Sequence, residues 1–119
     1  MTPQEIFDKA VGGVIRQGSL AKGENNVCRY RTKDGRACVV GQLIDDDLAH
    51  QWDDRCDPAF LIIWRYDPDE IPVELRPHIQ LLTDLQQAHD DASTTLRPFE
   101  CFHDLVRQVA NTHNLEFKF

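Results

Sequence analysis

Apolar residues recur at helical spacing near the start of the chain and predict an amphipathic helix over residues 2–17. Thr2 is a suitable N-cap, Glu5 completes a capping box with it, and Gly18 is a typical C-terminal stop. The Gly12-Gly13 pair weakens the middle of this helix and indicates that another element approaches it closely. The repeating apolar residues are Ile6, Phe7, Ala10, Val11, Val14 and Ile15.

The same spacing occurs twice in the last third of the chain, where we expect two more helices. The first covers about residues 77–92, and the second opens at Pro98 and ends at a cap near Asn114. Phe117 and Phe119 follow as a short tail that either packs or moves. The expected inward side chains are Ile79, Leu82, Leu85, Ala88, His89 and Ala92 on the first helix, and Phe102, Leu105, Val106, Val109 and Ala110 on the second.

Between these helices, residues 27–32 largely alternate between apolar and basic side chains, which is typical of a half-buried strand. Asp34-Gly35 is a strong hairpin turn, and residues 36–40 supply a returning strand. The alternation predicts Tyr30 inward and its two arginine neighbours outward. Gly41 either ends the second strand or begins a short helix.

The segment from Asp45 to Glu74 is acidic and interrupted by prolines. Its opening run of three aspartates, followed by apolar residues up to Trp52, predicts a short helix with carboxylates at its N-terminus. A second short apolar segment runs from Pro58 to Tyr66. With no repeat and no linker, the chain is expected to form a single domain over residues 1–119. The predicted fold class is α+β, mostly helical, with one small antiparallel hairpin or sheet packed on the helices.

The composition is that of an ordinary globular protein, with 119 residues, 41% hydrophobic and 28% charged. No apolar run approaches the roughly 18 residues that a membrane span needs. The opening residues contain neither the basic nor the apolar region of a secretory signal. We therefore expect a cytoplasmic protein that does not act at a membrane.

Four cysteines occur without any Cys-x-x-Cys pair, and reduced thiols without a metal or other cofactor are the expectation. The alternative is a zinc site with four thiolates, or with three thiolates and an imidazole such as His103. The cysteines are Cys28, Cys38, Cys56 and Cys101.

Two parts of the sequence resemble a group of small proteins encoded by phages, prophages and environmental bacteria. The matching residues are Cys28-Arg29-Tyr30-Arg31, Gly35-Arg36-Ala37-Cys38, Gly41, Leu43-Ile44, Asp46 and Leu85-Gln86-Gln87-Ala88-His89-Asp90. The closing helix is also similar to that group. The resemblance implies an accessory protein of a mobile element in a bacterial cytoplasm, and it implies no catalytic or binding residues.

Charge is distributed unevenly, although the whole chain carries −7. Residues 1–44 have a net charge of +3, residues 45–74 of −8, and residues 75–119 of −2. A dense carboxylate surface keeps a protein soluble, binds a divalent cation or docks on a basic partner. The aspartates lack the spacing of a calcium loop, and such a surface repels duplex DNA, so direct DNA binding is not expected.

Our leading hypothesis is a non-enzymatic, phage-type accessory protein that binds and inhibits a host defence or nucleic-acid-handling complex. Its acidic segment would compete for a groove lined with lysine and arginine, and nearby aromatic residues would anchor the contact. Both tryptophans are also candidates for the core. The predicted contact residues are Asp45, Asp46, Asp47, Asp53, Asp54, Trp52, Trp64 and Tyr66.

Two alternatives come from other functional classes. The basic hairpin offers a site for RNA or a small anion, with Arg29, Arg31, Lys33 and Arg36 as its residues. The doublets His89-Asp90 and His103-Asp104 suggest a metal-dependent phosphohydrolase, although His89 on an apolar helix face is more typical of a core histidine. No glycine-rich phosphate loop and no nucleophile elbow is present, so an enzyme is the less favoured class.

Overall fold

The computed structural model describes residues 1–22, 29–53 and 68–119, and 67% of these lie in helices. Within these ranges the α-helices are α1 (Pro3–Gln17), α2 (Asp46–Asp53), α4 (Ile79–Ser93) and α5 (Pro98–Thr112). Short 3-10 helices are η2 (Val40–Leu43), η3 (Pro68–Glu70) and η4 (Val73–His78). No helix in the described part is both long and apolar enough to cross a membrane.

The ends of the long helices follow from their capping residues. The Thr2 side chain accepts a hydrogen bond from the Glu5 backbone N–H, and the Glu5 carboxylate accepts one from the Thr2 backbone N–H. This reciprocal pair confirms the predicted capping box and lowers the pKa of Glu5. The helix stops at Gly18, whose φ is 80°. The predicted helices at both ends of the chain are therefore confirmed to within a few residues.

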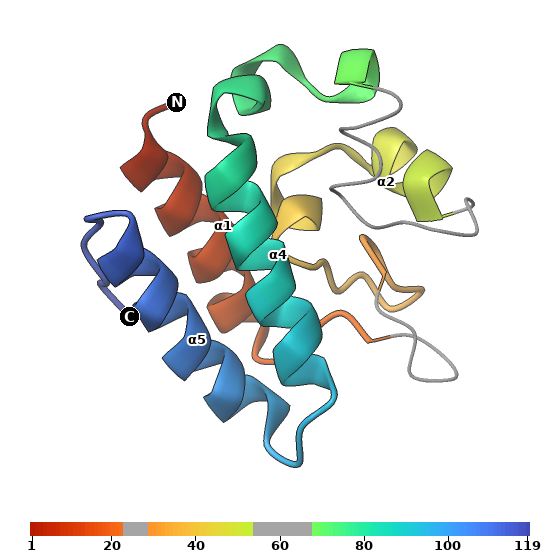
Figure 1. Cartoon of the computed structure of the whole chain (residues 1–119). Coiled ribbons are helices and arrows are strands. Elements are labelled where there is room, and N and C mark those ends of the chain that lie inside the picture. Colours follow the sequence, from red (N-terminus) through yellow and green to blue (C-terminus); the bar gives the residue numbers. More distant parts are fainter. Residues whose placement is uncertain (23–28, 54–67) are drawn as a thin grey trace.

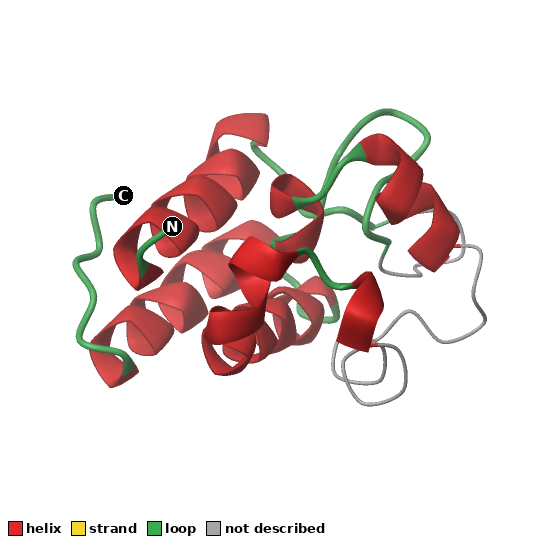
Figure 2. Ribbon diagram, turned by 90° about the horizontal axis from the view of Figure 1, so that it is seen from above, coloured by secondary structure: helices red, strands yellow, loops and turns green. Residues whose placement is uncertain are grey.

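α1, α4 and α5 lie side by side with their axes roughly aligned, and α4 and α5 form an antiparallel pair (Figure 1). α2 and the segment around η2 lie on the other side of α4, away from α5, as the view from above also shows (Figure 2). The core between these parts contains the inward faces of all four α-helices. Its largest fully buried side chains are Trp52, Phe7, Phe102, Ile6, Ile71, Leu75, Leu82 and Leu85.

The predicted β hairpin is wrong, because the described part of the chain contains no β-strand. Residues 29–37, called here the basic turn, are closed by one antiparallel bridge between Arg31 and Ala37. The Thr32 N–H donates to the Arg36 carbonyl oxygen at 2.8 Å beside this bridge. The mostly helical character was predicted correctly, but the β component of the α+β class was not.

Two contacts explain why the turn does not extend into a strand pair. After Val39 the chain enters η2, and Gly41 packs so tightly that a Cβ there would lie 2.1 Å from the Tyr30 carbonyl oxygen. In addition, the carboxylate of Asp53 accepts hydrogen bonds from the backbone N–H groups of Tyr30 and Arg31. A carboxylate therefore replaces part of the ladder that a neighbouring strand would supply.

Most of the predicted core residues are buried as expected. Tyr30 is 3% exposed, and Leu82, Leu85 and Phe102 are fully buried. Leu105 and Val109 were also expected in the core, but they are only partly buried against it. They line the outer side of the α4–α5 pair, where no third element covers them among the described residues.

Candidate functional site

Three consecutive exposed carboxylates lie at the start of α2, from Asp45 just before the helix and from Asp46 and Asp47 in its first turn. Asp45 caps the helix, because its side chain accepts a 2.8 Å hydrogen bond from the Leu48 backbone N–H. Negative charge is favourable at a helix N-terminus, so the fold itself stabilises this arrangement. The three aspartates are solvent-facing, as the sequence predicted, and we call them the acidic surface.

A pocket of about 500 Å³ lies beside the acidic surface. Its only lysine or arginine among the described lining residues is Arg31, which donates to the Asp46 carboxylate at 2.6 Å. The same guanidinium also donates to the carbonyl oxygens of Gly41 and Ile44, at 3.0 and 3.3 Å. Arg31 is thus fixed by the fold, and carboxylates dominate the pocket. Its lining residues are Arg31, Asp46, Asp47, His50, Gln51 and Asp53.

Asp53 is not solvent-facing, although the sequence predicts it to be so. It is partly buried, and its two carboxylate oxygens accept the Tyr30 and Arg31 N–H groups at 2.8 and 3.0 Å. This side chain ties the end of α2 to the basic turn. These two hydrogen bonds give Asp53 a structural role that sequence spacing could not reveal.

The aromatic residues proposed as anchors do not lie on this surface where the structure describes them. Trp52 is fully buried and packs edge-on against Tyr30, with ring centroids 5.1 Å apart. The burial of Trp52 therefore supports its assignment to the core. Asp54, Trp64 and Tyr66 lie outside the described residues.

Arg36, one of the four cations of the basic turn, ties the turn to the segment that precedes it. Arg36 pairs with Asp34 at 3.1 Å and donates to the carbonyl oxygens of Leu20 and Lys22. The Thr32 hydroxyl, followed by the Arg36 guanidinium, holds the pKa of Asp34 below its usual value. Arg31 is engaged as well, and Arg29 and Lys33 are exposed.

The two His-Asp doublets do not meet. His89 is fully buried, and its Nε2 accepts the Ala21 backbone N–H at 3.2 Å. The neutral ring therefore carries its proton on Nδ1, which donates to Asp90 at 3.1 Å. His103 contacts the backbone oxygen of Phe119 at 3.0 Å instead. Nowhere in the described part do three His, Cys, Asp or Glu side chains converge to hold a metal ion.

The two described cysteines are free thiols. Cys38 is buried, accepts a hydrogen bond from the Gly41 N–H at 3.3 Å, and has its pKa raised by that burial. A thiol that resists ionisation is a poor nucleophile and a poor zinc ligand. Cys101 is partly exposed on α5, while Cys28 and Cys56 lie outside the described residues.

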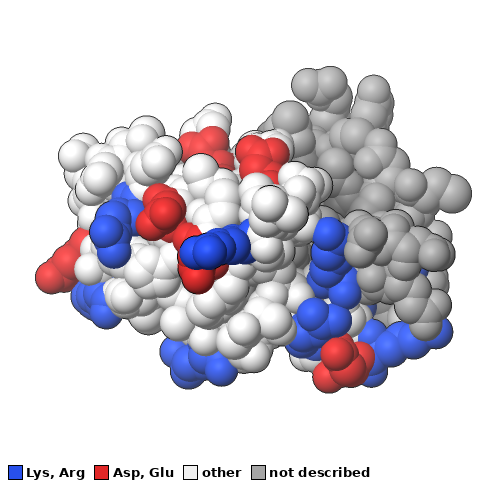
Figure 3. Space-filling model, turned by 90° about the horizontal axis from the view of Figure 1, so that it is seen from below, with Lys and Arg blue, Asp and Glu red and all other residues white. Residues whose placement is uncertain are grey.

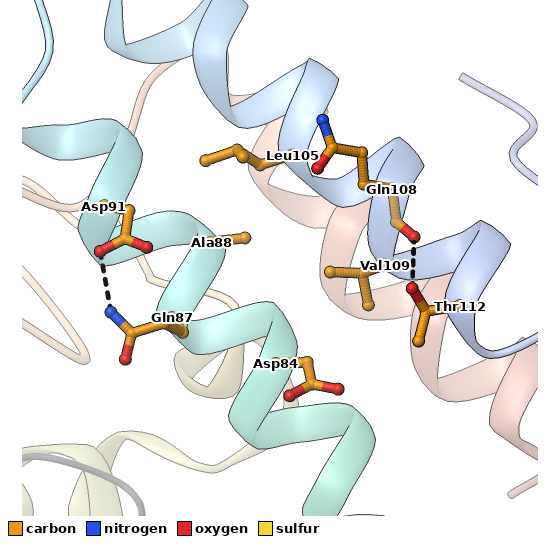
Figure 4. Close-up of a pocket in the computed structure, with 8 residues that line it drawn as sticks. All are labelled: Asp84, Gln87, Ala88, Asp91, Leu105, Gln108, Val109 and Thr112. Atoms are coloured by element: carbon orange, nitrogen blue, oxygen red, sulfur yellow. Dashed lines mark hydrogen bonds between the residues drawn. The ribbon is translucent and has the colours of Figure 1, made fainter.

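A second pocket, of about 280 Å³, lies between α4 and α5. Asp84, Gln87 and Asp91 line it from α4, opposite Leu105 and the α5 residues around it (Figure 4). Its polar α4 side chains have partners, because Gln87 donates to Asp91 at 2.8 Å and Asp84 pairs with His113 at 2.8 Å. The sequence did not predict this pocket. It exists because Leu105 and Val109, which were expected in the core, are only partly buried.

Comparisons with protein-family models, with curated proteins and with solved structures found no match to this chain. The interpretation of the acidic surface therefore rests on its geometry and charge.

Proposed function

We propose that this protein is a non-enzymatic binding protein whose acidic surface docks on a basic site of another macromolecule. The observation that carries the proposal is the grouping of Asp45, Asp46 and Asp47 at the exposed start of α2. The described residues of the acidic segment, 45–53 and 68–74, contain seven Asp or Glu and no Lys or Arg. Such a concentration attracts a basic partner and raises the association rate.

The partner that we propose is a host defence or nucleic-acid-handling complex, and the protein would inhibit it in the bacterial cytoplasm. The kind of partner and the inhibition are proposed from the resemblance to phage-encoded accessory proteins. Its physical basis is that a complex which handles nucleic acid has a groove lined with lysine and arginine, where carboxylates can replace phosphates.

Charge reversal at the acidic surface tests the proposal with immobilised poly-lysine as the probe. Asp46→Lys with Asp47→Lys should slow association roughly tenfold, because the attraction that guides the encounter is removed. Dissociation should change less. Asp45 stays unchanged since it caps α2, and Asp53 stays unchanged since it holds the basic turn. Circular dichroism melting establishes that the variant is folded.

The matched control is Glu100→Lys with Asp104→Lys on α5, which reverses the same number of exposed charges. Glu100 lies in the first turn of its helix, as Asp46 and Asp47 do, so one of the two control changes also removes a favourable charge from a helix N-terminus. If both double variants slow association equally, binding follows net charge and the acidic surface is not the site.

A single-stranded RNA probe tests the alternative at the basic turn. Our proposal predicts no RNA binding by the unaltered protein. RNA binding that is lost in Arg29→Glu with Lys33→Glu would assign the function to the basic turn instead.

A further inference from the structure

Residues 115–119, called here the tail segment, fold back from α5 toward the start of α1 (Figure 2). The reversal occurs at Asn114, whose φ is 55°, and the Leu115 N–H donates to the Ala110 carbonyl oxygen at 2.8 Å. This is the hydrogen bond of a Schellman motif with Asn114 in the left-handed conformation. The tail segment itself forms no helix or strand.

Side chains of α1 and α5 hold the main chain of the tail segment. The Gln4 amide donates to the Glu116 carbonyl oxygen at 2.9 Å and accepts the Glu116 N–H at 2.8 Å. His103 on α5 lies 3.0 Å from the backbone oxygen of Phe119. The paired contact from Gln4 fits the backbone N–H and carbonyl oxygen of any residue except proline, because both of its partners are backbone atoms of Glu116.

Two aromatic rings of the tail segment have matching positions on the helices. The Phe117 ring packs edge-on against His103, with centroids 4.9 Å apart, and the Arg107 guanidinium lies 5.0 Å from its centroid. The Phe119 ring lies against Gly12, where a Cβ would come within 3.0 Å of it. The close approach expected from the glycine pair is thus confirmed, and α1 leaves room for an aromatic side chain.

The residue between the two rings also has a partner of its own. Lys118 pairs with Asp8 on α1 at 3.1 Å, at an exposed position. Phe119 remains 37% exposed, whereas Phe117 packs edge-on against the buried Phe7, with ring centroids 6.4 Å apart. The tail segment therefore lies on the surface at its end and covers Phe7 at its centre. The residues that receive it belong to two long helices and keep their positions through their own helical hydrogen bonds.

We propose that Gln4, Asp8, Gly12, His103 and Arg107 form a peptide-docking groove for an aromatic–basic–aromatic segment of a partner protein, in extended form. The tail segment occupies this groove when the partner is absent. The seated segment defines the chemistry of the ligand: a main chain held by Gln4, two aromatic rings and a cation between them. This site lies on α1 and α5 and goes beyond the acidic surface on α2, on which it does not depend (Figure 1).

A dye-labelled peptide with the sequence of residues 113–119 tests the groove by fluorescence anisotropy. The full chain carrying Phe117→Ala with Phe119→Ala loses the anchors of its own tail but keeps every groove residue. We expect it to bind the peptide at least roughly tenfold more tightly than the unaltered chain, since a linked competitor has been weakened. A peptide with alanine at both phenylalanine positions should not bind. Equal binding of the two peptides, or no binding, would overturn the proposal.

A pair of glutamine variants in the same background locates the binding. Gln4→Leu should reduce peptide affinity at least roughly tenfold, because it removes both backbone contacts. Gln80→Leu is the matched control, since Gln80 also donates to an aspartate one turn later, Asp84, but does not contact the tail segment. Similar losses in both variants would place the peptide elsewhere.

A second way of releasing the tail segment keeps its aromatic residues. Asn114→Val disfavours the left-handed turn, whereas Asn114→Gly retains it and serves as the control. Only the valine variant should gain peptide affinity, and it should remain a monomer in light scattering. A dimer formed by exchanged tails would assign the groove to a second copy of this chain and contradict the partner assignment.

Discussion

At the scale of single residues, Asp53 stabilises the conformation of the basic turn. Its carboxylate accepts two adjacent backbone N–H groups, from Tyr30 and Arg31. The residue lies 22 positions beyond Arg31 in a run of charges that looks solvent-facing. Nothing in the local pattern distinguishes it from Asp47, which is exposed. The correct prediction of three exposed aspartates and the error at Asp53 therefore come from the same signal.

Replacing Asp53 by asparagine tests this structural role. The amide keeps one acceptor but places an NH₂ group against the second N–H, so Asp53→Asn should lower the free energy of unfolding by about 1.5–3 kcal/mol. Urea titration measures the loss. The matched change Asp47→Asn, at an exposed position, should stay within about 0.5 kcal/mol. If the two variants are equally stable, Asp53 does not hold the turn.

At the scale of elements, the long helices were predictable because their signals are local. The capping box at Thr2, the stop at Gly18 and the turn at Asn114 each act within a few residues, and the structure confirms all three. The prediction of a β hairpin was wrong because the conformation of this segment depends on contacts from elsewhere in the chain. Gly41 and Asp53 supply these contacts, and period-two alternation carries no information about them.

The same distinction applies to the candidate site. The exposed start of α2 was predictable, because three aspartates before an apolar run are typical of a helix N-terminus. The burial of Trp52 against Tyr30 was not predictable, since the spacing of Trp52 in the sequence fits both a core and a surface position. The sequence signals for the packing of the tail segment were Gly12, which lies against Phe119, and the two phenylalanines of the tail itself.

Two leucines distinguish the core of the α4–α5 pair from its outer side. Leu85→Ala should cost about 2–5 kcal/mol of unfolding free energy, because the side chain is fully buried and its removal leaves a cavity. Leu105→Ala should cost clearly less, since this side chain is only partly buried beside the pocket. Denaturant titration of both variants measures the difference. A loss at Leu85 no larger than that at Leu105 would contradict the assigned faces.

At the scale of the whole molecule, the proposed function depends on where charge lies rather than on its sum. The chain carries −7 in total, but its first 44 residues carry +3. Acidic and basic side chains are interspersed across the face seen from below (Figure 3). Exposed charges act over about 8–10 Å near physiological ionic strength. In the proposed function, a basic partner is guided by the local grouping of carboxylates at α2.

Amide chemical-shift mapping by NMR tests the central claim most directly. A lysine peptide is titrated into the unaltered protein labelled with ¹⁵N, and the shift of each backbone amide is followed. We predict that the largest changes fall on residues 45–51, where the acidic surface lies, and that they diminish as salt is added. Largest changes around Asp84 and Asp91 on α4, or equal changes at all exposed carboxylates, would contradict docking through the acidic surface.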